Sequence, residues 1–166
     1  MLKTILPKKT KPIPPTSSNW SNIAVGVKLS SPGPIIFKQK RLGLNGKLFD
    51  FYKFRSMVVG SDNDDSRKKE MVDLIKGNKS NGNNGSTKVV NASQITKFGK
   101  FIRKYSLDEL LQLFNVIKGD MSLVGPRPCL PYEYEVYDDW HKRRLDVRPG
   151  CTGLWQVTGR SETSYD

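Results

Sequence analysis

A β-hairpin near residues 35–55 is the feature that most constrains the fold of this 166-residue chain. Two runs rich in β-branched and aromatic residues, IIFKQKRLG and KLFDFYKFRSM, flank the turn LNG at 44–46. An Asn-Gly turn between two such runs is the strongest short-range hairpin signal. Alternation along the second run predicts a face that carries Lys53 and Arg55 beside aromatic rings. We therefore expect a small sheet built on this hairpin.

Helical patterns occur on the C-terminal side of the hairpin. Residues 66–77 have apolar side chains at helical spacing, 94–105 are amphipathic, and 132–147 have the composition of another helix. Helices combined with a single hairpin are typical of an α/β or α+β domain, with helices packed around a small sheet.

The clearest helical pattern begins at Ser106 and is expected to end at Gly119. Its apolar stripe consists of Leu107, Leu110, Leu111, Phe114 and Ile117. Ser106 and Glu109 have the spacing of a capping box, in which each side chain bonds to the other residue's backbone N–H. Asp108, in the first turn, would also stabilise the positive end of the helix.

The adjacent acids Asp108 and Glu109 permit a second interpretation. A carboxylate at a helix N-terminus beside cations is expected to have a lowered pKa and to stay ionised. Ionised carboxylates are Mg²⁺ ligands and can act as nucleophiles toward phosphorus. Local pattern alone leaves the capping and catalytic interpretations open.

Basic residues outnumber acidic residues, and the formal net charge of the chain is +12. Such a charge suits anionic lipid, nucleic acid or phosphorylated substrates. No nucleic-acid-binding motif is present, so we expect no nucleic-acid partner. Arg127 is the most specific candidate for phosphate, because prolines on both sides fix its backbone in the loop GPRP. The candidate phosphate-binding cations are Lys53, Arg55, Arg103, Lys104, Arg127, Arg143, Arg144, Arg148 and Arg160.

The remaining segments suggest one domain with a tail and an insert. Residues 1–22 are rich in Pro and Lys and are expected to form a flexible tail, followed by a domain over 23–166. An Asn/Gly-rich insert at 77–91 is expected to be mobile. His141 lies in a charged run and is expected to be a solvated surface residue. No window is long and apolar enough for a membrane span.

Three blocks resemble the bacterial sugar transferases, the monotopic phosphoglycosyl transferases: SPGPIIFKQKRLGLNGKLFDFYKFRSM, ITKFGKFIRKYSLDELLQLFNVIKGDMSLVGPRP and RRLDVRPGCTGLWQVTGR. The resemblance implies transfer of a sugar 1-phosphate from a UDP-sugar to polyprenyl (undecaprenyl) phosphate, with release of UMP. This is the first membrane step of exopolysaccharide, lipopolysaccharide or glycoprotein assembly. The implied location is the cytoplasmic face of the inner membrane, and full-length relatives can form homodimers.

The same resemblance assigns roles to individual residues. Asp108 and Glu109 correspond to the catalytic pair of the family, with Asp108 as the nucleophile that forms a covalent phosphosugar intermediate. Mg²⁺ would be held by Asp108 with help from Glu109. The basic residues implied in substrate binding are Lys53, Arg55 and Arg127, with weaker candidates Arg103, Arg144, Arg148 and Arg160. Gln156 is either a contact to the nucleotide or sugar, or a structural amide.

Several positions depart from the family pattern. Residues 1–20 are rich in Pro and Lys where relatives have a re-entrant membrane helix, so we expect this helix to be lacking. Residues 91–94 replace an Asp-Pro-Arg sequence, Leu111 replaces a common proline, and the chain ends at Asp166. We therefore expect a C-terminally truncated catalytic domain that associates loosely with anionic lipid or is soluble. The alternative is an inactive remnant that binds a membrane or a partner protein.

Overall fold

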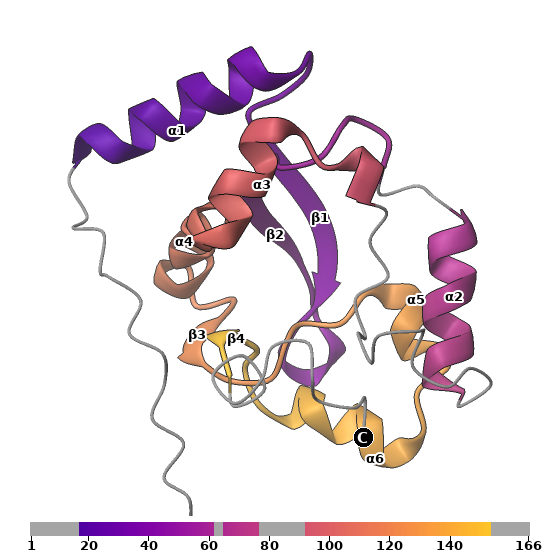
Figure 1. Cartoon of the computed structure of the whole chain (residues 1–166). Helices are drawn as coiled ribbons and strands as arrows, with labels where there is room; N and C mark the ends of the chain where they lie inside the picture. Colours follow the sequence, from indigo (N-terminus) through magenta and orange to yellow (C-terminus); the bar gives the residue numbers. More distant parts are fainter. Residues whose placement is uncertain (1–16, 62–64, 77–91, 154–166) are drawn as a thin grey trace, which may run out of the picture.

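Helices surround two short sheets in the described part of the chain, residues 17–61, 65–76 and 92–153 of the computed structural model (Figure 1). The elements, with η for a 3₁₀ turn, follow one another as α1 (Ser17–Ser30), β1 (Ile36–Leu42), η1 (Leu44–Gly46), β2 (Leu48–Phe54), α2 (Asp65–Ile75), η2 (Ala92–Gln94), α3 (Lys97–Lys104), η3 (Leu107–Glu109), α4 (Gln112–Ile117), β3 (Ser122–Val124), α5 (Pro131–Tyr134), α6 (Asp139–Lys142), η4 (Arg143–Asp146) and β4 (Gly150–Thr152). This mixture confirms the predicted α/β class.

The predicted hairpin is confirmed. Strands β1 and β2 pair antiparallel along their whole length, from Ile36 opposite Phe54 to Leu42 opposite Leu48. The turn between them places Asn45 at φ 55° and Gly46 at φ 74°. Asn and Gly adopt this left-handed conformation at the least steric cost, which explains why the turn forms at this dipeptide.

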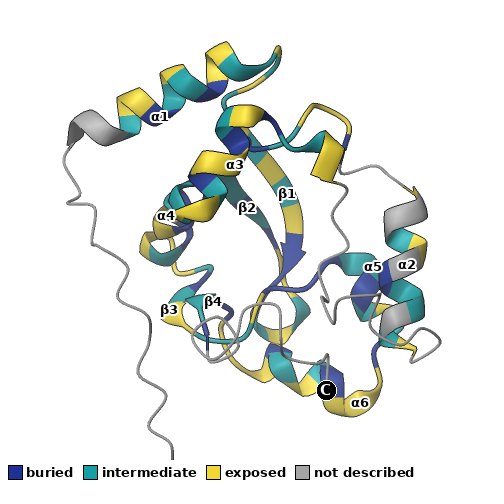
Figure 2. Ribbon diagram, in the orientation of Figure 1, coloured by how far each residue is buried: buried dark blue, intermediate teal, exposed yellow. Residues whose placement is uncertain are grey.

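Helices and loops cover both faces of β2, whereas β1 keeps exposed residues on one of its faces (Figure 2). On one face, Phe54 packs with residues of α1, α3 and the segment before α4; this cluster consists of Ile23, Val27, Phe54, Ile102 and Leu111. On the other face, Phe49 and Phe51 pack against Met121. Because successive residues of β2 point to opposite faces, the strand needs aromatic residues at both odd and even positions.

Asn115 fastens α4 to β2 and is fully buried. Its side-chain oxygen accepts from the backbone N–H of Tyr52 at 3.3 Å, and its amide nitrogen donates to the carbonyl of Asp50 at 2.6 Å. The amide thus supplies the hydrogen bonds that a neighbouring strand would make. This contact fixes the start of α4, and the residues that precede it, relative to β2.

A second, parallel pair of strands, β3 and β4, lies close to the first sheet. A Cβ on Gly125 would meet the carbonyl oxygen of Arg148 at 2.6 Å, and one on Gly150 would meet the backbone nitrogen of Gly125 at 2.1 Å. These contacts leave no room for side chains. The two glycines therefore allow the loop after β3 to approach β4.

The segment predicted as one helix over 132–147 is instead broken into α5, α6 and η4, so that prediction is wrong. Asp138 is extended, at ψ 166°, between the first two pieces. The break allows Tyr137 and Leu145 to pack in a core cluster with Leu42 and Cys129. It also buries His141 against the rings of Tyr137 and Trp140, so the expected solvated role of His141 is wrong.

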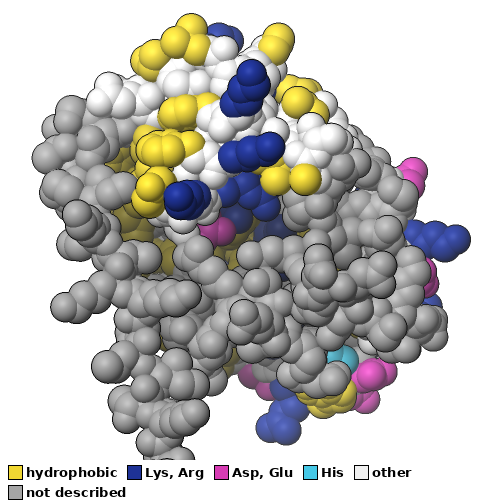
Figure 3. Space-filling model, viewed as in Figure 1, with side chains coloured by type: hydrophobic (Ala, Val, Ile, Leu, Met, Phe, Trp, Pro, Cys, Tyr) yellow, Lys and Arg dark blue, Asp and Glu magenta, His cyan; other side chains and the backbone are white. Residues whose placement is uncertain are grey.

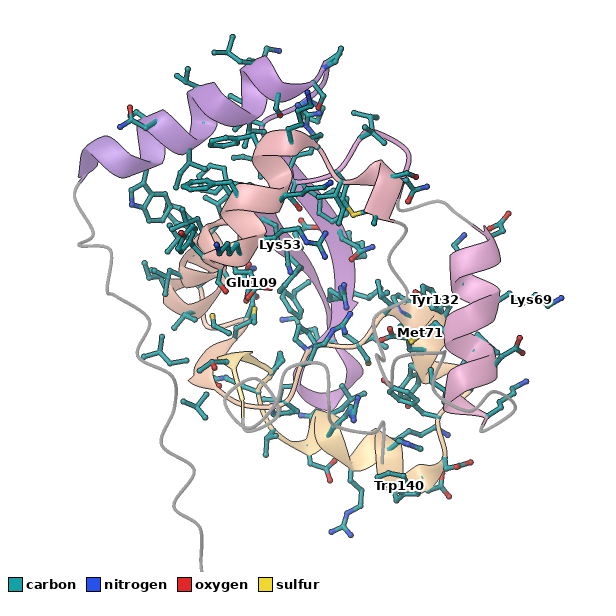
Figure 4. All side chains as sticks on the ribbon, in the orientation of Figure 1. Lys53, Lys69, Met71, Glu109, Tyr132 and Trp140 are labelled. Carbon is teal, nitrogen blue, oxygen red and sulfur yellow. The ribbon has the colours of Figure 1, made fainter. Side chains whose placement is uncertain are left out.

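Helix α2 confirms the helix predicted in this region and begins one residue earlier, at Asp65. Its buried Met71 faces α5, where Tyr132 lies, while Lys69 points away from the core (Figure 4). The apolar spacing in this charged segment therefore serves to seat α2 on α5.

Helix α1 begins at Ser17, inside the segment predicted as a tail, so residues 17–22 are helical. Among the described helices, none has the length and hydrophobicity needed to cross a bilayer. The predicted insert at 77–91 lies outside the described residues, as do residues 1–16 and 154–166.

Gly99 allows α3 to pack against the segment that follows β2. A Cβ at this position would lie 1.9 Å from the carbonyl oxygen of Ser56. We expect Gly99→Ala to lower the free energy of unfolding by about 1–3 kcal/mol, because the backbone has to shift to relieve the clash. Lys100→Ala, on the exposed side of the same helix, should change it by less than about 0.5 kcal/mol. Denaturant unfolding of both variants measures this, and equal stability would contradict the predicted clash.

Candidate active site

Asp108 and Glu109 lie in η3, a single 3₁₀ turn between α3 and α4. Ser106 precedes this turn in the left-handed conformation, at φ 56°, and its side chain makes no capping hydrogen bond there. The predicted capping box is therefore wrong, as is the prediction of one continuous helix from Ser106 to Gly119. The predicted end is confirmed, because α4 stops at Ile117 and Gly119 has φ 80°.

The side chain of Glu109 pairs with Lys53 of β2. Lys53 Nζ lies 2.8 Å from Glu109 Oε1, and both side chains are partly buried, with 26% and 30% of their surface exposed. Figure 4 shows the two side chains pointing toward each other between the hairpin and η3. The carboxylate that the capping box assigned to the backbone therefore binds a cation of the hairpin, 56 positions away in sequence.

Asp108 is buried, with 6% of its surface exposed. Burial raises the pKa of Asp108 above its usual value, and the negative charge of Glu109 adds to this effect; Lys53 and Arg103 act in the opposite direction. The lowered pKa expected from the sequence is therefore wrong in direction, because removal from water outweighs the nearby cations. A carboxyl group held in this way is a stronger base and nucleophile when ionised than an exposed one.

Lys53 is less deeply buried than Asp108 but is also partly removed from water. Burial lowers the pKa of Lys53, while Glu109 and Asp108 raise it and Arg41 adds a lowering effect. Its ammonium lies 5.2 Å from the centre of the Phe51 ring, which confirms the predicted face of Lys53 beside aromatic residues. Lys53 therefore pairs with Glu109 and has a stronger effect on the pKa of Asp108 than Arg103 has.

Arg55 does not join this group. Its guanidinium donates to the carbonyls of Pro34 (2.6 Å), Pro32 (2.9 Å), Ser31 (2.7 Å) and Val27 (3.3 Å), and to the Ser31 hydroxyl. These five bonds match the five N–H groups of an arginine. Arg55 therefore binds the end of α1 and the SPGP turn, and we remove it from the candidate phosphate-binding set.

Replacing Arg55 should affect stability rather than substrate binding. We expect Arg55→Met to lower the free energy of unfolding by about 2–4 kcal/mol, because several backbone carbonyls lose their donor. Arg55→Lys, with fewer donors, should have a smaller effect. In either folded variant the Michaelis constant for a UDP-sugar, the substrate that the sequence resemblance implies, should change less than about threefold. A large rise in that constant without a loss of stability would restore Arg55 to the substrate-binding set.

The other predicted cations occupy different positions. Arg103, in α3, is half-buried and close enough to Asp108 to favour its ionised form. Arg127 is exposed in the loop between β3 and α5. Arg144 donates to the Tyr137 hydroxyl at 3.0 Å, within another cluster, and Arg148 is exposed before β4. Gln156 and Arg160 lie outside the described residues.

Sequence reasoning missed Arg41, whose guanidinium is buried with 7% of the residue exposed. It lies 5.3 Å from the centre of the same Phe51 ring that Lys53 contacts. The hairpin register carried the signal, because Arg41 is opposite Phe49 and hence on the face of Phe51 and Lys53. Sequence reasoning also missed the buried amides of Gln112 and Asn115, which no local pattern marks.

The acid pair could bind a divalent cation whose remaining ligands include the phosphate oxygens of a substrate. Among the described residues, no group of three or more His, Cys, Asp or Glu side chains could hold a metal ion by itself. Mg²⁺ is commonly bound through one or two carboxylates together with substrate phosphates. The buried carboxyl group of Asp108, beside Glu109, provides this smaller donor set.

Comparison with known proteins identifies the family. The family model described as bacterial sugar transferase matches residues 13–166. The match covers nearly the whole chain, and the chain therefore belongs to this family. The resemblance noted in the sequence is confirmed.

The curated relatives include named transferases. The chain is 52% identical over 135 residues to galactosyl transferase CpsE of Streptococcus agalactiae, and 48% identical over 137 residues to undecaprenyl-phosphate galactose phosphotransferase of Salmonella typhimurium. It is 45% identical over 145 residues to UDP-glucose:undecaprenyl-phosphate glucose-1-phosphate transferase of Xanthomonas campestris. The aligned regions cover 81–85% of this chain but only 26–28% of these relatives.

Proposed function

We propose that this chain transfers a sugar 1-phosphate from a UDP-sugar to undecaprenyl phosphate and releases UMP. The observation that carries the proposal is the buried Asp108 beside the Glu109–Lys53 ion pair, on a chain of the bacterial sugar transferase family. The names of two relatives include undecaprenyl phosphate together with galactose or glucose. A hexose is therefore the sugar to test first.

Asp108 acts as the nucleophile in the proposed first step. Its carboxylate oxygen attacks the β-phosphorus, a new P–O bond forms, and the bond from that phosphorus to the bridging oxygen breaks. UMP leaves with the bridging oxygen and its electron pair. In the second step a phosphate oxygen of the lipid attacks the same phosphorus, and Asp108 leaves as a carboxylate. The product is a polyprenyl diphosphate sugar.

The surrounding cations reduce the repulsion between an anionic nucleophile and an anionic diphosphate. Lys53 and Arg103 lie near Asp108 and favour its ionised form. Arg127, exposed on the GPRP loop, is the proposed contact for the remainder of the diphosphate. Lys53 also holds Glu109 beside the nucleophile through their 2.8 Å contact.

Asp108 and Glu109 would hold Mg²⁺ together with the diphosphate. When bound, this ion neutralises charge on the phosphate oxygens. Glu109 keeps one carboxylate oxygen for Lys53, and its other oxygen is available as a ligand. The buried position of Asp108 keeps water away from the phosphorus, which protects a covalent intermediate from hydrolysis.

We further propose that the face formed by α3 and α4 lies against the anionic cytoplasmic surface of the membrane. Phe101, Phe114 and Ile117 are exposed on these helices, with 49%, 51% and 82% of their surface accessible. Figure 3 shows hydrophobic and basic side chains intermixed over the upper part of the face in view. Apolar and basic residues on one surface suit an anionic lipid interface. A homodimer, which the sequence resemblance implies, stays a prediction.

The test is a panel of UDP-sugars incubated with the protein, Mg²⁺ and undecaprenyl phosphate in phosphatidylglycerol vesicles. We expect UMP release with UDP-galactose or UDP-glucose that depends on Mg²⁺ throughout and on the lipid phosphate for every turnover after the first. A folded protein that releases no UMP with any sugar of the panel would contradict the proposal. That result would favour the alternative of a non-catalytic protein, for which binding of the same vesicles would be the remaining activity.

A further inference from the structure

The GPRP loop is fixed on both sides of Arg127, and Arg41 makes one of the fixing contacts. On the C-terminal side of Arg127, the backbone N–H of Leu42 donates to the carbonyl of Cys129 at 3.0 Å. On the N-terminal side of Arg127, the backbone N–H of Gly125 donates to the carbonyl of Thr152 at 2.9 Å, and the N–H of Gly150 donates to the carbonyl of Pro126 at 2.9 Å. Arg127 thus lies at the exposed apex of a short segment whose two ends belong to different parts of the fold.

The guanidinium of Arg41 is held by two neutral acceptors. Its Nη1 donates to the carbonyl of Pro128 at 2.9 Å, while Nε and Nη2 both donate to Gln39 Oε1, at 3.0 Å and 2.8 Å. Gln39 therefore orients the planar guanidinium of Arg41 so that its Nη1 group reaches the Pro128 carbonyl in the loop. A lysine at this position would keep the charge but could not bond to both partners in this geometry.

Arg41 also connects the loop electrostatically to the acid pair. Burial lowers the pKa of Arg41 to about 10, and repulsion by Arg127 contributes in the same direction, whereas Glu133 opposes it. Arg41 likewise acts on Lys53, and both cations contact the Phe51 ring. The positive charges of Lys53, Arg41 and Arg127 therefore form a continuous series from η3 to the loop. Glu109 and Glu133 offset part of the repulsion among these cations, and a bound anion would offset more of it.

We infer that Arg41 is a positioning residue, which holds the loop carrying Arg127 through the Pro128 carbonyl so that Arg127 can grip a diphosphate. The role of Arg41 in substrate binding rests on the proposed function. Its role in holding the loop does not depend on that function. Arg41 acts through Arg127 and not by touching the reacting phosphorus. Its loss should therefore weaken substrate binding more than it slows the chemical step.

The kinetic test is a double-mutant cycle of Arg41→Met and Arg127→Met with the UDP-sugar that the wild type uses. We expect Arg41→Met to raise the Michaelis constant about tenfold, with kcat changed less than about threefold. In the Arg127→Met background the further rise should be less than about twofold, because the residue through which Arg41 acts is already absent. Equal effects in the two backgrounds would overturn the inference.

Two further variants separate the shape of Arg41 from its charge and protect the test against misfolding. Arg41→Lys should behave like Arg41→Met, and full activity of Arg41→Lys would overturn the role of the fork. Gln39→Leu leaves Arg41 in place but removes the acceptor of two of its hydrogen bonds. Like Arg41→Met, it should raise the Michaelis constant, by about threefold. If Arg41→Met does not fold, the cycle is run with Gln39→Leu, and the same criterion of coupling to Arg127 applies.

Hydrogen exchange tests the loop without using activity. We expect the backbone amides of Gly125, Arg127, Cys129 and Leu130 to exchange faster in Arg41→Met and Gln39→Leu than in the wild type, with residues 97–104 of α3 unchanged. Unchanged exchange at 125–130 would overturn the inference even if the wild-type protein is active. Absence of wild-type turnover with faster exchange in the variants would instead contradict the proposed function and leave the positioning contact supported.

Discussion

Asp108→Asn is expected to abolish UMP release while leaving the protein folded and more stable than the wild type. An amide has the same shape as the carboxyl group but cannot attack phosphorus, so we expect turnover to fall at least about 10³-fold. Stability should rise because the folded state disfavours ionised Asp108, as its raised pKa shows. The assay is UMP release combined with thermal unfolding at neutral pH.

The sign of the stability change follows from linkage. A carboxyl group with a raised pKa binds its proton more tightly in the folded protein than in the unfolded chain. Ionisation therefore costs stability above the folded-state pKa, and this cost disappears below the ordinary value of 3.8. The gain in melting temperature of Asp108→Asn should accordingly shrink as the pH is lowered toward that value. Asp146→Asn, at an exposed acid of η4, serves as the control and should change neither activity nor stability.

Lys53→Met is expected to have the second largest effect. It removes the partner of Glu109 and a cation near the nucleophile, and we expect kcat/KM to fall by about 10²–10³. The pH dependence should also change. Lys53 lowers the pKa of Asp108, so its loss should raise that pKa further. Since only ionised Asp108 attacks, the acidic limb of the profile should move to higher pH.

Lys53→Arg is the matched control, because it keeps the positive charge. Its acidic limb should stay close to that of the wild type even if the rate is reduced by altered geometry. The measurement is kcat/KM against pH at constant Mg²⁺ for the wild type and both variants. A limb that stays in place in Lys53→Met, or moves to lower pH, would show that Lys53 does not act on Asp108.

The hairpin and its register follow from local sequence. The Asn45-Gly46 turn specifies where the chain reverses, and the aromatic residues of β2 specify that both of its faces are covered. Turn chemistry and alternation act over a few residues, which is why they can be read without a structure. The same register would have placed Arg41 beside Lys53 and Phe51, had it been extended across the turn.

The helix expected at Ser106 shows where local reasoning failed. Ser106 and Glu109 have the spacing of a capping box, but Glu109 binds Lys53 instead, and Ser106 adopts a left-handed conformation. An ion pair between residues distant in sequence outweighed the local cap. Such a contact depends on how α3 and β2 pack, and this packing is absent from any short window.

Burial was the second source of error. The sequence places Asp108 beside cations, which favours a lowered pKa, but desolvation raises it in the folded chain. Arg55 likewise was expected to bind phosphate, because the family resemblance implies it in substrate binding together with Lys53. In the structure its five donors are bound to the end of α1 and the SPGP turn. Depth in the fold determines the role of a charged residue, and composition does not report it.

A covalent adduct on Asp108 tests the central proposal most directly. The protein is incubated with Mg²⁺ and UDP-galactose or UDP-glucose, without undecaprenyl phosphate, and its intact mass is measured. We predict the gain of one hexose phosphate, located on Asp108 by peptide mapping, absent from Asp108→Asn and removed when undecaprenyl phosphate is added. UMP release that requires both substrates together, with no adduct on a folded and active protein, would contradict Asp108 as the nucleophile.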